Sequence, residues 1–394
     1  MACDAVTEFL SYESGRIMTP ILKRRTFPRS IWMSLIRRGT LPNEMGEQLT
    51  ALVYERSAPT EAAPEWLDMT IADGQEGGLC LPPSTKINVA STTRVFGPAR
   101  RVVEGPDICN IDIRPAVDLY NQLASVSGIL GDYVKIEWEI RDRHEYFRLC
   151  QTKVVVDSCS DPTESTTMAT TYPASCPTQP LSWAVLDKYK IYLLQDGAGA
   201  EALLRSDGAP VGVVITGFET AGNLIRQNSA IREDIRFSNK ANLLIESFGV
   251  SYAYDGITIL RDPFNRRFTC DAGTYTEVPA FILTPATKGQ KAIVRPAYRT
   301  APYEESFWFD QNVFTQLIVA PPTAPHPDFL FNPVDYTGML KLYNIPDRVC
   351  NPDGNIIFHR AHLAAASYPV EPERGVAFVH ERCEPMGCTD TCQS

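Results

Sequence analysis

The chain has 394 residues, of which 44% are hydrophobic, and carries a formal net charge of −10. A chain of this length and composition can bury about three quarters of its unfolded surface, in two or more domains. The acidic balance argues against a surface that binds nucleic acid in general. Because the sequence has neither a signal peptide nor 18 consecutive apolar residues, we expect a soluble protein that is made in a cytoplasm and enters no membrane.

Residues 1–64 are predicted to form an extended arm, because short apolar runs mix with Pro and Arg and end in SAPTEAAPEW. Within residues 1–43, seven basic residues against three acidic ones give a local net charge of +4. Such an arm can contact phosphate or an acidic neighbouring subunit, and a solvated basic tail explains the charge equally well. The basic residues are Arg16, Lys23, Arg24, Arg25, Arg29, Arg37 and Arg38.

Residues 65–113 carry Gly and Pro around two β-like runs, INVASTTRVF and ICNIDI. Two strands separated by a polar stretch predict a long hairpin that projects from the body of the protein.

The run from Arg114 to Cys150 predicts a long helix that starts at Pro115, a residue suited to the first helical position. Its second half is ambiguous, because Val134, Ile136, Trp138 and Ile140 also alternate with charges as in a strand. Steps of three and four place the apolar residues Leu119, Leu123, Val126, Leu130, Tyr133, Ile136 and Ile140 on one stripe. The polar residues Asn121, Asp132, Lys135, Glu139 and Asp142 are predicted to lie on the opposite side.

The remaining chain alternates strand and helix signals, which predicts an α+β protein with mixed sheets. KVVVDSC reads as a strand, and the Ser-, Thr- and Pro-rich stretch after it as an exposed insertion. LSWAVLDKYKIYLLQDG predicts an amphipathic helix with Leu186, Tyr189 and Leu193 on one side. VGVVITGFE predicts a buried strand followed by a helix, and the segment after residue 250 predicts mainly strands. In the last block, two strand-like ends flank an alanine-rich middle.

One stretch has the spacing of a dinucleotide-binding loop, with Gly197, Gly199 and Ala202 followed by Glu219 about twenty residues on. That chemistry needs a strand before the glycines and a helix after them. The preceding run has the period of a helix, so Gly197 is better explained as a helix C-terminal glycine. We therefore predict no cofactor.

The C-terminal segment contains His380, Cys383, Cys388 and Cys392, four soft ligands within thirteen residues. Their order is unusual for a zinc site, and a frayed or disulfide-forming tail is the preferred interpretation, so we predict no metal. His359 and His362 lack the Glu of a zinc-protease helix and are interpreted as partly buried structural residues. The carboxylate pairs Glu304–Glu305 and Glu371/Glu373 are interpreted as surface charge, and no catalytic residue is predicted.

Eleven cysteines, an odd number in a chain this long, do not indicate a secreted disulfide scaffold. Most are predicted to be small buried thiols, with a minority able to pair in oxidising surroundings, and the sequence leaves the pairing open. They are Cys3, Cys80, Cys109, Cys150, Cys159, Cys176, Cys270, Cys350, Cys383, Cys388 and Cys392.

The order of arm, hairpin, long helix and interleaved α+β body resembles the major capsid protein of tailed double-stranded DNA bacteriophages, with the Hong Kong 97-type fold. The passages FPRSIWMSLIRRGTLPNEMG, LLQDGAGAEALLRSDGAPVGVVITGF, SFGVSYAYDGITILRDPFNRRF and HLAAASYPVEPERGVAFVHERC are similar to divergent members of that family. The resemblance implies an N-terminal arm at 1–64, an extended loop at 65–113 and a peripheral domain with the spine helix at 114–180. It also implies a mainly axial domain at 181–345 and, at 346–394, a return to the peripheral domain followed by a Cys-rich tail.

The function implied by the resemblance is self-assembly, as pentamers and hexamers, into an icosahedral head that encloses double-stranded DNA without sequence-specific binding. The expected partners are other copies of the chain, a separate scaffolding protein, a portal at one vertex and a possible decoration protein. The expected location is the virion, after assembly in the host bacterial cytoplasm. Lys86 is the only lysine in the predicted loop and has no identifiable partner, so no isopeptide cross-link is expected.

Apolar residues of the arm and hairpin are expected to be hard to bury within one subunit and to lie across neighbours, where many weak contacts add up. They are Ile31, Trp32, Leu35, Val95 and Phe96. The alternatives are a nucleotide-dependent enzyme that uses the Gly197 loop and another virion structural protein, such as a tail component.

Overall fold

The computed structural model describes eighteen segments, and the account below refers to these alone. They are residues 31–41, 49–55, 90–96, 99–104, 108–109, 136–158, 161–195, 203–204, 210–227, 250–254, 257–263, 265–279, 281–282, 293–294, 296–319, 334–336, 340–345 and 356–382. No helix in these segments is long and apolar enough to cross a membrane.

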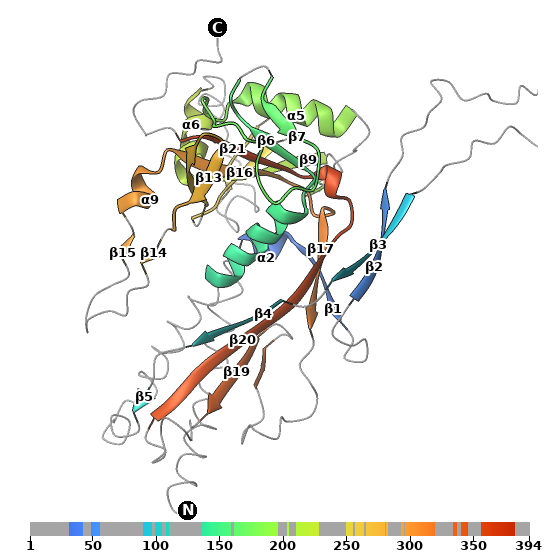
Figure 1. The fold of residues 1–394 in the computed structure, drawn as a ribbon, viewed down its shortest axis with the longest axis vertical. Coiled ribbons are helices and arrows are strands. Elements are labelled where there is room, and N and C mark those ends of the chain that lie inside the picture. The colour runs from blue at the N-terminus through green and yellow to red at the C-terminus, as the bar shows by residue number, and fades with distance from the viewer. Residues whose placement is uncertain are drawn as a thin grey trace, which may run out of the picture.

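A ten-stranded mixed sheet forms one end of the molecule (Figure 1). Its main path runs β10–β11–β9–β16–β21–β6–β7, with β8, β12 and β13 attached to it. The strands are β6 (Thr152–Val155), β7 (Thr163–Ser165), β8 (Leu203–Leu204), β9 (Pro210–Thr216), β10 (Val250–Tyr254), β11 (Ile257–Arg261), β12 (Arg267–Asp271), β13 (Thr274–Glu277), β16 (Tyr303–Phe309) and β21 (Val376–Glu381).

Both faces of this sheet are covered, and successive side chains of its central strands alternate between two hydrophobic clusters. On β16, Phe307 and Phe309 belong to one cluster and Trp308 to the other. Helices α5 (Trp183–Gln195) and α6 (Phe218–Gln227) pack on the Trp308 side, and residues 136–149, also helical, contribute to the opposite side. The predicted α5 stripe is confirmed, because Leu186, Tyr189 and Leu193 are all buried there.

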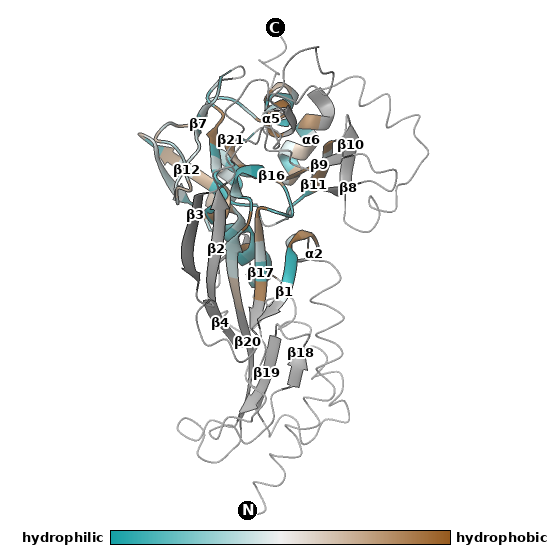
Figure 2. Ribbon diagram, turned by 90° about the vertical axis from the view of Figure 1, so that its right-hand side faces the viewer, coloured by the Kyte–Doolittle hydropathy of each residue, from teal (hydrophilic) through white to brown (hydrophobic). Residues whose placement is uncertain are grey.

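A seven-stranded sheet extends from that end of the molecule (Figure 1). Its path runs β1–β17–β20–β19–β18, and β4 and β5 also pair with β20. The strands are β1 (Arg37–Leu41), β4 (Ala99–Glu104), β5 (Ile108–Cys109), β17 (Phe314–Val319), β18 (Val334–Tyr336), β19 (Leu340–Ile345) and β20 (Ile356–Pro369). Figure 2 shows from the side how far β19 and β20 extend from the ten-stranded sheet.

Strand β20 pairs with β17, β19, β4 and β5 of the seven-stranded sheet, and its length corrects one expectation. Its alanine-rich middle does not separate two strands, because 14 consecutive residues form one strand. Residues 360–363 pair with both β4 and β19, and Ala365 pairs with β4 and β17, so pairing on two sides compensates for the low strand propensity of alanine. His359 and His362 lie in this strand, and their predicted partial burial concerns side chains outside the described part of the structure.

A two-stranded antiparallel ribbon also differs from the predicted hairpin. Strand β3 (Ala90–Phe96) pairs with β2 (Leu49–Glu55) over seven residue pairs. The described part of the run ICNIDI, Ile108–Cys109, forms β5, which pairs with β20 instead. The ribbon therefore joins residues from both sides of the boundary predicted at residue 64.

Residues 136–149 are helical, which decides the ambiguity in the second half of the long run against a strand. The first half, from Arg114, lies outside the described residues. The predicted stripe is wrong here: Ile140 is 38% exposed, whereas Glu139 and Asp142 are 4% and 0% exposed. The reason is that both carboxylates have buried polar partners on other elements.

The segment that contains the short helix α2 (Ile31–Leu35) and β1 folds onto its own subunit. Trp32 is fully buried, Ile31 and Leu35 pack against the core, and β1 pairs in parallel with β17. The expectation that these three apolar residues cover a neighbour is therefore wrong. Val95 and Phe96 lie on β3, but their side chains are outside the described part of the chain.

Four further short elements belong to the described structure. They are β14 (Phe281–Ile282), β15 (Ile293–Val294), α9 (Pro296–Thr300) and the 3₁₀ turn η2 (Pro372–Arg374).

The packing beneath α5 and α6 predicts that two glycine-to-alanine substitutions differ in their effect on stability. A Cβ at Gly212 of β9 would lie 2.5 Å from Cζ2 of Trp308, which is buried and cannot move aside freely. We expect Gly212→Ala to lower the free energy of unfolding by about 1–3 kcal/mol through overpacking. Thermal unfolding of the purified chain measures the effect.

Gly222→Ala is the matched control, because a Cβ there meets nothing within 4 Å and the residue lies inside α6. This variant should be as stable as the parent or more stable by up to about 1 kcal/mol. Equal stability of both alanine variants would contradict the proposed contact with Trp308.

Candidate functional site

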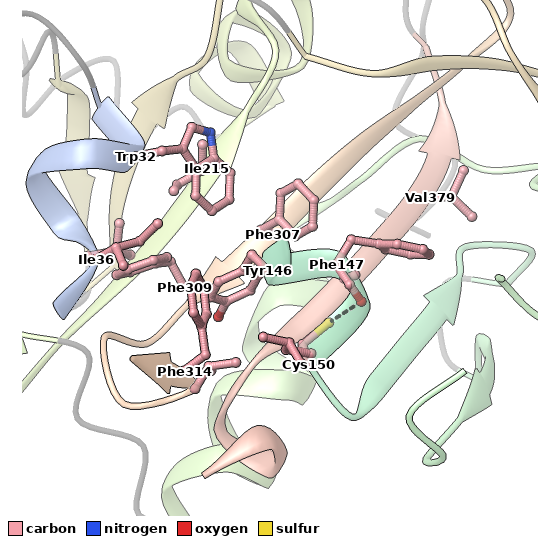
Figure 3. Packing of buried hydrophobic residues seen from close by; sticks show 14 of the residues in the cluster. Trp32, Ile36, Tyr146, Phe147, Cys150, Ile215, Phe307, Phe309, Phe314 and Val379 are labelled. Atoms are coloured by element: carbon pink, nitrogen blue, oxygen red, sulfur yellow. Dashed lines mark hydrogen bonds between the residues drawn. The ribbon is translucent and has the colours of Figure 1, made fainter. Parts of the chain in front are cut away.

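Trp32 lies at the junction where the N-terminal segment, the helix 136–149 and strand β16 meet (Figure 3). Its ring centroid is 5.2 Å from that of Phe307, 5.5 Å from that of Tyr146 and 6.0 Å from that of Phe309. The contacts with Phe307 and Phe309 are edge-to-face, a favourable geometry for aromatic pairs. Trp32 therefore contributes a large buried side chain from the N-terminal segment to the hydrophobic core.

The polar groups of Trp32 are also satisfied by residues distant in sequence. Its indole Nε1 donates a hydrogen bond to Oδ2 of Asp262 at 3.1 Å, and its backbone N–H donates to Oε2 of Glu139 at 3.1 Å. Arg143 lies 3.7 Å from the same oxygen of Asp262. Both acceptors are buried carboxylates, so directional hydrogen bonds as well as apolar contacts fix the position of Trp32.

Arg38, which lies on β1 six residues after Trp32, provides a second anchor. Its Nη2 lies 3.1 Å from Oδ2 of Asp142, and its Nε donates to Oε1 of Gln316 at 3.0 Å. Gln316 Nε2 in turn donates to the other oxygen of Asp142 at 2.7 Å. The three side chains tie β1, the helix 136–149 and β17 together.

Strand β16 carries two adjacent carboxylates, and the structure corrects their interpretation as surface charge. Glu304 and Glu305 are both 0% exposed, because β16 lies in the middle of the ten-stranded sheet. The flanking Pro302 suggested a solvated segment, but it lies just before the strand. The other pair lies at η2, where Glu371 and Glu373 are partly exposed and Glu371 forms an ion pair with Arg374.

Glu305 is neutralised by partners on the face that also holds Trp32. Tyr172 donates its hydroxyl to Oε1 of Glu305 at 2.7 Å, and Arg266 Nη1 lies 3.4 Å from the same oxygen. Arg266 also pairs with Glu277 at 2.9 Å and stacks on Phe268, with its guanidinium carbon 4.9 Å from the ring centroid. Burial raises the pKa of Glu305, and Arg266 opposes that shift.

Glu304 lies on the opposite face, next to α6. Thr220 donates its hydroxyl to Oε1 of Glu304. Burial raises the pKa of Glu304 to about 7, with Arg267 opposing the shift and Glu219 adding to it. Glu219 itself pairs with Arg382 at 3.0 Å and with Arg267 at 3.6 Å.

The two carboxylates do not form an acid–base pair. Neighbouring residues of a strand point to opposite faces of the sheet, and the partners of Glu304 and Glu305 lie on different elements accordingly. General acid–base catalysis by two carboxylates needs both groups to reach one substrate. The arrangement is therefore a pair of separate structural anchors.

His380, the first residue of the candidate zinc set, is engaged inside the ten-stranded sheet. Its Nε2 is 2.7 Å from the Ser306 hydroxyl and its Nδ1 is 3.0 Å from the carbonyl oxygen of Glu381, so both ring nitrogens have protein partners. Burial lowers the pKa of His380 to about 4, which keeps the ring neutral. No group of three or more potential ligands gathers within the described segments, and Cys383, Cys388 and Cys392 lie outside them.

The elements around the Gly197 loop have the reverse of the order that a dinucleotide site needs. A helix, α5, ends at Gln195, and a strand, β8, follows at Leu203. The glycines themselves lie outside the described residues. A helix before the loop and a strand after it place no helix N-terminus toward a pyrophosphate, which supports the interpretation of Gly197 as a helix-terminal residue.

The buried side chain of Asp142 predicts a pH dependence. Burial raises its pKa from 3.8 to about 6, while Arg38 lowers it. A carboxyl with a raised pKa contributes stability that is present below its unfolded pKa and is lost as the pH rises through its folded pKa. The stability of the parent relative to Asp142→Asn should therefore fall as the pH rises from about 4 to about 6 and then level off.

Melting temperatures of the two proteins, measured from about pH 4 to pH 7 at constant ionic strength, test this expectation. Glu304 and Glu305 titrate in both proteins, so their effects cancel in the difference. A difference that stays constant, or grows with pH, would contradict the role assigned to Asp142.

Comparison with known proteins identifies the fold of the chain. No protein-family profile and no curated protein matches the sequence. The capsid chain of Cyanophage Pam1 is similar in structure, with a TM-score of 0.50 and 12% identity over 90% of this chain and 92% of that chain. The capsid of Ralstonia phage GP4 gives a TM-score of 0.49 at 10% identity, over 92% and 93%. The likeness to the Pam1 chain over nearly the full length shows that this chain has the Hong Kong 97-type capsid fold that its sequence predicts.

Proposed function

We propose that the chain is a major capsid protein that assembles as pentamers and hexamers into the icosahedral head of a double-stranded DNA bacteriophage. The observation that carries the proposal is the likeness to the Pam1 capsid chain, which extends over 90% of this chain and 92% of the other. The match therefore includes both the ten-stranded and the seven-stranded parts of the chain in one alignment of nearly full length. Because one fold can serve several functions, the assembly itself has to be tested.

The β2–β3 ribbon supports the proposal. In Figure 1 it lies to one side of the two larger sheets, and its last residue pair is Glu55 with Ala90. Residues 56–89 connect these two ends of the ribbon. We assign the ribbon to the extended loop, which moves the start of that loop from residue 65 to residue 49. Across a neighbouring subunit, it would add one contact per copy to a lattice of many contacts.

The domain roles follow the same proposal. The helix 136–149 would be part of the spine of the peripheral domain, with β20 alongside it, and α5 and α6 would belong to the axial domain. The net charge of −10 suits a wall that encloses DNA without gripping it. The partners would be further copies of the chain, a scaffolding protein, a portal and a possible decoration protein, with assembly in the bacterial cytoplasm.

An enzymatic function has no support in the described residues. The buried carboxylates Glu304 and Glu305 face apart, His380 has protein partners on both ring nitrogens, and the Gly197 loop lies between a helix and a strand. We therefore propose a structural role.

Co-expression with a scaffolding protein of the same phage tests the proposal. Negative-stain microscopy should show closed shells of uniform diameter, and cryo-microscopy should show this chain in their wall. Only soluble monomers, under every expression condition and with the scaffolding protein present, would refute the function.

The ribbon predicts a specific assembly defect. Alternate residues of a strand donate their N–H groups to the partner strand, so Thr92→Pro with Thr93→Pro removes at least one ladder bond from β3. We expect the yield of closed shells to fall at least about tenfold, because a small loss at each subunit is multiplied over the lattice. Particle counts by microscopy measure the yield.

Serine at the same two positions is the control, because it keeps both N–H groups. The proline variant should retain the melting temperature of the two-sheet body, which shows that the chain has folded. A normal yield of shells from the proline variant would argue against a role of the ribbon in assembly.

A further inference from the structure

Cys176 and Cys270 form a disulfide that links residues 94 positions apart. Cys270 lies on β12, and Cys176 lies in the stretch between β7 and α5. The bond therefore fastens an irregular segment to the β12–β13 hairpin of the ten-stranded sheet. This segment was predicted to be an exposed insertion, and that prediction is correct for its first part alone.

Contacts that need no covalent bond hold the two cysteines close together. Tyr275, opposite Cys270 on the hairpin, donates its hydroxyl to the carbonyl oxygen of Ser175. Gly273 at the hairpin turn has a φ of +82°, and a Cβ there would lie 2.6 Å from the carbonyl carbon of Ala174. The backbone on both sides of the pair is thus in close contact before any sulfur chemistry.

Tyr172 anchors the same segment to the core. It is 7% exposed, its ring centroid is 4.9 Å from that of Phe147 and 5.5 Å from that of Tyr275, and its hydroxyl donates to buried Glu305. None of these contacts involves a sulfur atom, so they can form while the thiols are still reduced. Docking through them would present the two thiols to each other at high effective concentration.

The two sulfurs differ in accessibility from the free cysteine of the same region. Cys176 and Cys270 are only partly buried, so small oxidants and reductants can reach them. Cys150 is fully buried, and burial raises the pKa of its thiol to about 12, which makes it inert. Of these three described cysteines, only the pair that the fold brings together is therefore accessible to redox reagents.

We propose that Cys176 and Cys270 form a redox staple, open in the reducing host cytoplasm and closed once the finished head is released into an oxidising medium. The timing rests on the proposed capsid function, because only a virion makes that passage. In the closing step both S–H bonds break and one S–S bond forms. The two thiols lose two electrons and two protons to dissolved dioxygen, which becomes hydrogen peroxide.

The staple would stabilise the capsid subunit after assembly has finished. Closing a loop of 94 residues removes conformational freedom from the unfolded chain. For a protein of this size the effect corresponds to a rise in melting temperature of about 5 °C. Assembly would then proceed with the open form, and the extra stability would be added outside the cell.

Differential alkylation tests the timing. Cells are quenched in acid and treated with N-ethylmaleimide, released particles are treated in the same way, and both samples are digested without reduction. The expected result is alkylated Cys176 and Cys270 from cells, and a cross-linked peptide pair from released particles. Cys150 should be alkylated in both of these acid-denatured samples but not in a third sample of intact particles treated at neutral pH without acid, which provides an internal control.

A comparison of variants tests the effect on stability. A reductant should lower the melting temperature of the parent particle by about 5 °C and leave that of the double variant Cys176→Ser with Cys270→Ser unchanged. The double variant tests whether another cysteine pair is responsible, because such a pair would keep the variant sensitive to reductant. Its yield of shells should equal that of the parent.

Three results would overturn the proposal: free thiols at both positions in released particles, a bond already closed inside cells, or the same response to reductant in parent and double variant. Cys176 and Cys270 can be mapped on the full-length chain even if no shells form. Failure of the capsid function and failure of the staple are therefore distinguishable.

Discussion

The burial of Trp32 is the contact on which the rest of the subunit depends. Its ring fills the space between the helix 136–149 and β16, and its two N–H groups donate to carboxylates 107 and 230 residues away. No other described residue of the N-terminal segment is as large and as buried. Since deletion of such a side chain costs about 3–5 kcal/mol, α2 is part of the fold and not an appendage to it.

The same junction connects the two sheets. Strand β16 belongs to the ten-stranded sheet and β17 to the seven-stranded one, with only four residues between them. Tyr146 spans this turn, because its hydroxyl donates to the carbonyl of Trp308 at 2.7 Å and accepts from the N–H of Asp310 at 3.0 Å. A helix residue thus fixes the point where the chain passes from one sheet to the other. For a shell built from many copies, a fixed angle there would give each subunit the same shape.

Patterns of neighbouring residues in the sequence correctly predict features that depend on local interactions. They fail for residues whose burial depends on partners far away in the sequence. The α5 stripe of Leu186, Tyr189 and Leu193 follows from helical period alone, so it was predictable. The burial of Asp142 was not, because its partner Gln316 lies 174 residues away and no spacing within the helix reveals it. Trp32 was misassigned for the same reason, since its acceptors come from other elements. The predicted hairpin has the wrong partner for β3, because β2 lies before residue 64, outside the block 65–113 in which both strands were sought.

The buried carboxylates of β16 show why such sites resist prediction and what they contribute. A slip of β16 by one residue would exchange the faces of Glu304 and Glu305. Glu305 would then lose Tyr172 and Arg266, and Glu304 would lose Thr220. A buried carboxylate without its partner costs several kcal/mol, whereas the paired arrangement adds little net stability over apolar residues. Their effect is therefore to penalise the wrong register of a central strand, and that penalty depends on the whole fold being present.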